Sequence, residues 1–289
     1  MIPRAFIVCI LAVLGWHFAR PHLPGFYAVP GQQRANYLRS QQFVHDAPAD
    51  AKVICGSSMS DRLDAVKLGA DHVKLTFPGG GPLTGLDLIQ KTGRTPPVVW
   101  VETNVILRAA EEDLLDDALS AWRRELRERS PIFKEEGRPS EFGVGFLKAV
   151  ATKAAKALET PKAAAALDQD TFNDVMKANR KHLDRKPDPK DLATKIARLG
   201  TLIDDLQTKG SKVILFEMPF DQSLTELAEP TAVRNALHER FPADCYCWLD
   251  LSQAEAIAFS KDGASVFAIS EGSGTPIIRF QRVVKVADE

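Results

Sequence analysis

The sequence is poor in histidine and cysteine, and it has no excess of either charge. Its 289 residues include six histidines and four cysteines, with 37 Lys and Arg against 38 Asp and Glu. Because the basic residues neither outnumber the acidic ones nor alternate with aromatic ones, the composition argues against a nucleic-acid partner. There is no internal repeat, and the only low-complexity tract is the run of alanines at 163–166. What remains is the composition of a globular protein with one large domain or two small ones.

The four cysteines show no metal-ligand spacing, and we expect neither a metal site nor a cofactor. Cys245 and Cys247 lie two residues apart along an expected extended strand, and we expect them not to bridge each other. All four, Cys9 and Cys55 included, are expected to be small buried hydrophobic residues. The alternative is a disulfide between Cys55 and Cys247, which would require an oxidising compartment and adjacent strands.

The one long apolar run lies at the N-terminus and is short for a membrane span. Residues 5–19 are apolar apart from His17, which is typical of the core of a signal sequence. No small-x-small cleavage site follows, because Ala19 precedes Arg20 and Pro21. We therefore expect residues 1–20 to be an uncleaved signal anchor, or else a signal peptide. The rest of the chain would then face the periplasm from the inner membrane, or be secreted. The alternative is a buried N-terminal helix of a cytosolic protein.

Residues 21–50 are rich in proline, glycine and polar residues, which predicts a linker with a short helix near 34–42. After this linker, strands are expected at 52–56, 71–77, 97–104, 211–219 and 245–251. Helices are expected between them at 61–69, 83–91, 191–207 and 229–240. A closing helix is expected at 275–286, although its β-branched content leaves a terminal strand as the alternative.

Strands that alternate with helices predict a parallel sheet with helices on both faces. The expected fold is α/β, a three-layer sandwich around a five-stranded parallel flavodoxin-like sheet of order 2-1-3-4-5. Residues 109–209 are rich in Ala, Leu, Lys and Glu, with helical spacing at 111–129, 142–158, 168–183 and 190–209. We interpret them as a helical insertion after strand three, within a single α/β domain at 51–289.

Polar residues follow the first three strands of this expected sheet. Strand one ends in Gly56-Ser57-Ser58, strand two in the glycines 79–81, and strand three in Glu102-Thr103-Asn104. In such sheets, ligands bind outside the carboxyl ends of the strands, at the point where the winding direction reverses. A hydroxyl nucleophile would meet backbone and side-chain amides there, which is the set that acyl transfer requires. The alternative is that Ser57 or Ser58 only caps the following helix.

These residues resemble the motifs of the SGNH (GDSL-like) hydrolases, and the layout resembles that of membrane-anchored members that act on envelope acyl groups. Gly56-Ser57-Ser58 is similar to the family's Gly-Asp-Ser block, with Ser57 in place of the aspartate and Ser58 as the nucleophile. Gly80, with Gly79 beside it, resembles the glycine that lends an oxyanion donor. Asn104 resembles the asparagine of the third block, without the flanking Gly and Asp. The resemblance covers residues 51–110 and 205–289.

The sequence departs from the family in its fourth block, Asp-x-x-His. Asp262 stands in the aspartate's position, but Ser265 stands in that of the histidine, and no histidine follows His238. Ser58 then lacks the imidazole whose pKa suits the removal of its proton near neutral pH. His72, His182 and His238 are expected to lie elsewhere. Direct action of Asp262 on Ser58 would be slow.

Of the residues named so far, Ser57, Gly79 and Ser265 are candidates for substrate contact, and three more residues join them. Glu102 and Glu217 lie in or after apolar strands, where an unpaired charge is costly, so each is either a site carboxylate or the partner of a Lys or Arg. Met218 either lines an acyl pocket or packs in the core.

The resemblance implies an envelope-facing serine esterase or O-acyltransferase that acts on small, acetyl-type esters of a carbohydrate. Two alternatives remain. One is a catalytically silent relative that binds an acylated polymer or scaffolds an envelope complex. The other is an adaptor that contacts an envelope protein through the helical insertion.

Overall fold

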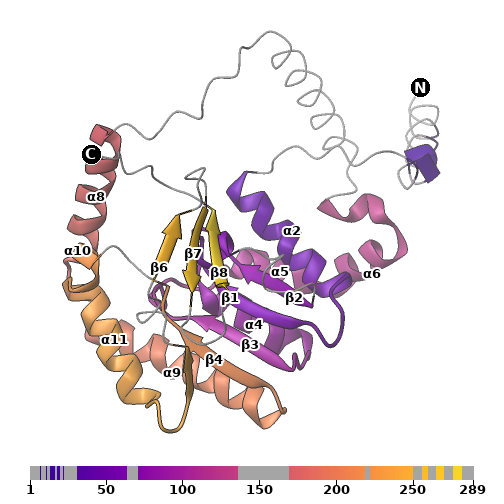
Figure 1. Cartoon of the computed structure of the whole chain (residues 1–289). Coiled ribbons are helices and arrows are strands. Elements are labelled where there is room, and N and C mark those ends of the chain that lie inside the picture. Colours follow the sequence, from indigo (N-terminus) through magenta and orange to yellow (C-terminus); the bar gives the residue numbers. More distant parts are fainter. Residues whose placement is uncertain are drawn as a thin grey trace. The chain divides into compact units, whose positions relative to one another are not determined.

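The computed structural model describes residues 31–63, 71–135, 169–218 and 222–249, together with the segments 256–259, 265–269 and 276–281 (Figure 1). Near the N-terminus it also describes residues 7, 11, 14–16, 18–19 and 22.

Five parallel strands form the central sheet, in the order β2-β1-β3-β4-β5, and this confirms the predicted α/β fold (Figure 1). The strands are β1 (Lys52–Gly56), β2 (His72–Thr76), β3 (Val98–Glu102), β4 (Lys212–Phe216) and β5 (Cys247–Leu249). In β1, Cys55 pairs with Leu75 on one side and Val101 on the other. Successive side chains of β1, which point to opposite faces of the sheet, are buried, as expected for a strand covered on both faces.

Helices with well-formed ends cover the sheet. Helix α4 (Pro82–Thr92) begins with a proline in its first turn and ends at Gly93, whose φ of 70° is the left-handed cap that favours glycine. Helix α9 (Pro189–Thr208) begins after Asp188, whose side chain accepts a hydrogen bond from the Lys190 amide. Helices α4 and α9 pack against each other, α4 on β1 and β2 and α9 on β4. The remaining helices of this part are α8 (Gln169–Leu183), α10 (Gln222–Thr225) and α11 (Ala228–Arg240).

The C-terminal part differs from the expected closing helix. Strands β6 (Ala256–Phe259), β7 (Ser265–Ile269) and β8 (Pro276–Gln281) form a second, antiparallel sheet. The predicted helix at 275–286 is therefore wrong and its strand alternative is right, because β-branched and aromatic residues after Pro276 favour extended backbone. The helix expected at 142–158, most of the one at 61–69, Pro219 and Phe220 lie outside the described residues.

The chain divides into two compact units. One unit comprises Met1–Asp46 and Asp113–Ala163, and the other comprises Ala47–Glu112 and Ala164–Glu289. In the first, α2 (Gln32–His45) covers and extends the short helix expected near 34–42, and it buries Phe43 and Val44. The same unit contains α5 (Glu112–Leu119), α6 (Ala121–Arg129) and the 3-10 turn η3 (Pro131–Phe133). The expected helical insertion is thus shared between the two units.

The cysteines correct a second expectation. Cys55 is a buried free cysteine, as expected. Cys245 and Cys247 are also free, but they are exposed, so the expected burial is wrong for these two. Strands β3 and β4 separate β1 from β5, and a Cys55–Cys247 disulfide is therefore ruled out. Cys9 lies outside the described residues. Among the described residues, no helix is both long and apolar enough to cross a membrane.

Candidate functional site

A buried carboxylate organises the turn that follows β1. Glu102, the last residue of the neighbouring strand β3, is 0% exposed. Its Oε2 accepts hydrogen bonds from the amide of Ser57 at 2.8 Å and from the amide of Ser60 at 3.3 Å. Its Oε1 accepts from the Ser57 hydroxyl at 2.7 Å, and Oε2 also accepts from the Ser60 hydroxyl. Four donors therefore satisfy one buried charge and fix both ends of the turn.

Ser57 also caps the short 3-10 helix η2 (Ser60–Arg62). Its Oγ accepts from the Met59 amide at 3.1 Å, and its carbonyl accepts from the Asp61 amide at 3.0 Å. Ser57 is 1% exposed. Ser57 and Glu102, both candidates for substrate contact, are buried and hydrogen-bonded to each other. Both residues instead position the turn.

Ser58 is the serine that this turn leaves unengaged. It is half-buried, at the carboxyl end of β1. Neither its hydroxyl nor its amide forms a hydrogen bond within the part of the chain that the structure describes. The turn thus presents a hydroxyl and an amide of the same residue at the sheet edge, the two groups that a serine nucleophile contributes to acyl chemistry.

The glycine loop after β2 lies beside the end of β1, because the Phe77 amide donates to the Gly56 carbonyl at 2.8 Å. Gly79 is exposed and has a φ of 85°, which favours glycine. The Gly80 amide donates to the Phe77 carbonyl at 2.9 Å, so in this structure it is already used within the loop. The Gly80 carbonyl accepts from Arg108 at 3.1 Å. The predicted role of Gly80 as an oxyanion donor would require this turn to open.

Asn104 extends the pairing of β3 with β4 through its side chain. Its Nδ2 donates to the Met218 carbonyl at 2.9 Å, and its Oδ1 accepts from the Met218 amide at 2.6 Å. This arrangement leaves the second Nδ2 hydrogen for a ligand. Met218 is buried and packs with Ile54 and Phe216. Its contacts therefore fit a role in the core better than a role in lining an acyl pocket.

Glu217 forms an ion pair with Arg234, with Oε1 and Oε2 at 3.1 and 3.0 Å from Nε. The prediction of a basic partner is therefore right for Glu217. Glu102 fits neither alternative, because hydroxyl and amide groups, and not a Lys or Arg, donate hydrogen bonds to its carboxylate.

The described histidines do not supply an imidazole to Ser58. His72 begins β2, at the amino edge of the sheet, and its ring nitrogen lies 3.0 Å from Asp71. His238 stacks on Trp248 with ring centroids 4.3 Å apart. Ser265 begins β7, and Asp262 lies outside the described residues, so the fourth-block prediction stays a prediction.

Glu229, in the first turn of α11, is a partly buried carboxylate that the sequence did not single out. Burial raises the pKa of the Glu229 carboxyl, while the charges of His182 and Arg108 act in the opposite direction. Helices α8 and α11 are in contact, and Arg108 binds the glycine loop as described above. The available signal was weak: Glu229 is an acidic residue in the first turn of the helix that follows β4.

Within the described residues, no group of three or more His, Cys, Asp and Glu side chains is arranged to hold a metal ion. A comparison of the chain with family models, curated proteins and solved structures finds no match.

Proposed function

We propose that this chain is an SGNH-like serine esterase or O-acyltransferase that attacks small, acetyl-type esters with Ser58. The observation that carries the proposal is the difference in hydrogen bonding among three neighbouring serines. The buried Glu102 engages Ser57 and Ser60, and Ser58 alone keeps its hydroxyl and amide unengaged at the sheet edge. A serine that merely capped a helix would use its oxygen for that purpose, as Ser57 does.

In the proposed reaction, Oγ of Ser58 attacks the ester carbonyl, and a C–O bond forms as the Oγ proton passes to a carboxylate base. The carbonyl oxygen becomes an oxyanion that accepts from the Ser58 amide and from the second Nδ2 hydrogen of Asn104. The ester C–O bond then breaks, and the alcohol leaves with the proton. Water yields the free acid, and a carbohydrate hydroxyl yields a new ester. The base would be Asp262, and turnover should be slow because a general base of suitable pKa contributes about 10²–10⁴-fold.

A second candidate is a catalytically silent relative that binds an acylated polymer or scaffolds an envelope complex. Two observations favour it. The Gly80 amide is used within its own loop, and among the described residues no histidine bonds to Ser58.

Hydrolysis of a nitrophenyl acetate by the full-length chain separates these candidates. The enzyme should turn the ester over slowly, and Ser58→Ala should abolish the activity. Ser120→Ala is the matched control, because Ser120 precedes α6 without a side-chain capping bond. Ser265→His should raise the rate by several orders of magnitude if the fourth block is aligned correctly. No turnover, or turnover that survives in Ser58→Ala, would refute the enzymatic proposal.

We also propose that the N-terminal segment anchors the protein in the inner membrane, with the rest in the periplasm. Four of its apolar side chains are exposed: Ile7, Leu11, Leu14 and Phe18. Such residues are stabilised by burial in lipid. The full chain should remain in the membrane pellet after carbonate extraction, whereas a chain that begins at Gly31 should be in the supernatant. Recovery of both in the supernatant would contradict the anchor.

A further inference from the structure

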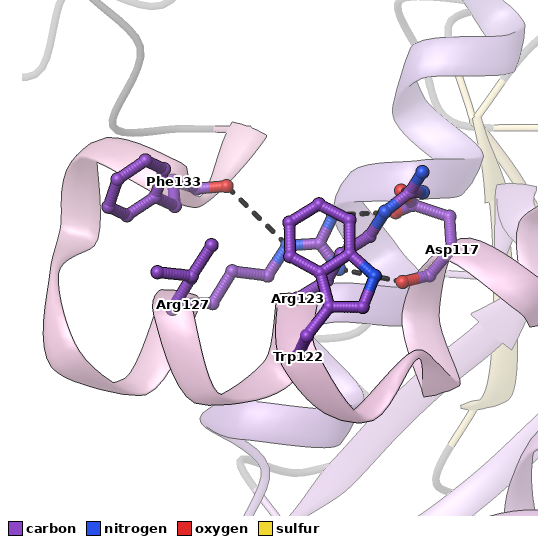
Figure 2. A pocket seen from close by; sticks show the side chains of 6 residues that line it. Asp117, Trp122, Arg123, Arg127 and Phe133 are labelled. Carbon is purple, nitrogen blue, oxygen red and sulfur yellow. Dashed lines mark hydrogen bonds and ion pairs between the residues drawn. The ribbon is translucent and has the colours of Figure 1, made fainter.

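A pocket in the unit that contains α2, α5 and α6 belongs to no part of the proposed esterase site. Its volume is about 280 Å³, and its lining residues are Asp117, Trp122, Arg123, Leu126, Arg127 and Phe133. Figure 2 shows Phe133 on one side of the view, Asp117 on the other, and the Trp122 ring face-on between them. This volume lies just below the range of about 300–1,000 Å³ that is usual for ligand sites, so it suits a single ring.

The aromatic side chains of this pocket are exposed. Trp122 is 62% exposed and Phe133 is 44% exposed. The Arg123 guanidinium lies 5.3 Å from the centre of the Trp122 ring, which is a cation–π contact. Exposed aromatic residues that border a pocket and are held by a charged neighbour provide a flat apolar surface for a ligand.

The charged groups of the pocket leave an excess of one positive charge. Asp117 is the single acidic lining residue, against Arg123 and Arg127. Its carboxylate accepts from Arg123 through Oδ1 and from Arg127 at 2.7 Å and Gln41 at 3.4 Å through Oδ2. Arg127 is 4% exposed and donates further to the carbonyls of Asp117 and Phe133. Asp117 and Arg127 are thus committed to each other within the pocket floor.

Arg123 is the donor that remains for a ligand. Its side chain is 43% exposed, and a single N–H of its guanidinium is bound to Asp117 among the described residues. The other N–H groups form the planar fork that binds carboxylates with two parallel hydrogen bonds. The lining carboxylate already accepts three hydrogen bonds, so the pocket offers more free donors than free acceptors. That asymmetry favours a planar aromatic acid over a sugar acid, whose hydroxyls need acceptors as well.

We propose that this pocket binds an aromatic carboxylate, with the ring between Trp122 and Phe133 and the carboxylate on Arg123. The proposal goes beyond the proposed esterase activity and does not depend on Ser58.

The test is saturation-transfer NMR and calorimetry on the full chain with benzoate, the neutral benzamide and glucuronate. Benzoate should bind with a Kd on the order of 1 mM or below. Benzamide and glucuronate should bind at least tenfold more weakly. Trp122→Ala and Arg123→Gln should each weaken benzoate binding at least tenfold, and Arg123→Lys should recover part of the loss.

Arg129→Gln is the matched control, because Arg129 lies on the same helix, is paired with Glu125 and does not line the pocket. It should bind benzoate as the wild type does. Absence of benzoate binding, equal binding of benzamide, tighter binding of glucuronate, or binding that Trp122→Ala leaves unchanged would each overturn the proposal. Trp122 is largely exposed, so its replacement tests the pocket even if Arg123→Gln disturbs the fold.

Discussion

The most consequential residue of the candidate site is a carboxylate that does not face a substrate. A buried charge costs several kcal/mol unless donors surround it. Glu102 has such a set, two amides and two hydroxyls from the turn after β1. The turn conformation and the carboxylate therefore stabilise each other, and Ser58 holds its place at the sheet edge as a consequence.

Replacement of Glu102 should reveal this role. Glu102→Ala leaves four buried donors without an acceptor and should lower the free energy of unfolding by about 3–5 kcal/mol. Glu102→Gln should cost only about 1 kcal/mol, because its oxygen can serve one group of donors and its nitrogen can donate to the Ser57 hydroxyl.

Guanidinium unfolding measures both values. Glu217→Gln is the control, since Glu217 is only partly buried in its ion pair with Arg234 and should lose no more than about 1 kcal/mol. A Glu102→Ala variant as stable as the wild type would show that the carboxylate does not hold the turn.

At the scale of elements, the end of β1 is built around the absence of a side chain at Gly56. A Cβ atom there would lie 2.5 Å from Oγ of Ser60 and 2.6 Å from Oε2 of Glu102. The same two atoms belong to the hydrogen bonds that fix the turn. Glycine is therefore required at this position because Ser60 and Glu102 occupy the space of a Cβ atom, and not because of its backbone conformation.

Gly56→Ala should destabilise the protein by about 2–4 kcal/mol, because the methyl group must displace Ser60 or the Glu102 carboxylate. Esterase activity should fall together with stability. Thermal unfolding and the nitrophenyl ester assay measure the two effects. Gly31→Ala is the control: nothing lies within 4 Å of its added Cβ, and it should cost only about 0.5–1 kcal/mol, from the poorer N-cap of α2. Equal stability of the two variants would contradict the crowding at β1.

The strands of the sheet could be predicted from the sequence, and so could the helices near 34–42 and at 111–129, but their packing into a separate unit could not. Strands β1, β3 and β4 are apolar runs between turn residues, a pattern that identifies strands buried on both faces. Helix α2 buries Asn36, Ser40 and Gln41 beside Phe43 and Val44, so its sequence has the polarity of a linker. Its partners lie about 76 to 101 residues along the chain, as in the bonds of Gln41 to Asp117 and Arg34 to Glu135.

The candidate site was predictable to the extent that strand ends determine it. The order of Ser58, the glycine loop and Asn104 along the chain places them at one edge of the sheet. The hydrogen bonds of Glu102, Gly80 and Asn104 were not predictable, because a carboxylate or an amide in a sequence is equally compatible with a ligand and with the backbone of a neighbouring strand.

At the scale of the whole molecule, stability should depend on pH through His45 of the first unit. The pKa of this imidazole lies below 6.5, and burial is the main cause. The positive charges of Lys134 and Arg127 lower the pKa further. Asp46 and Glu128 act in the opposite direction, with the Glu128 carboxylate 3.9 Å from the His45 ring nitrogen. The native state therefore keeps His45 neutral at pH values where the unfolded chain binds a proton.

Stability contributed by neutral His45 is present above pH 6.5 and is lost as the pH falls from 6.5 through the folded-state pKa. His45→Gln removes this dependence. Between pH 7.5 and 5, the wild type should lose more of its free energy of unfolding than the variant does. Denaturant unfolding across that range measures the difference. Parallel curves for the two proteins would show that His45 is as easily protonated in the native state as in the unfolded state.

The central claim is that Ser58 is the reactive serine of an acyl-transfer site, and a fluorophosphonate probe tests it most directly. The probe phosphonylates an activated serine, and peptide mass spectrometry locates the adduct. We predict one adduct, on Ser58, that is lost in Ser58→Ala and retained in Ser120→Ala. An unlabelled protein, or an adduct on any other serine, would contradict the claim.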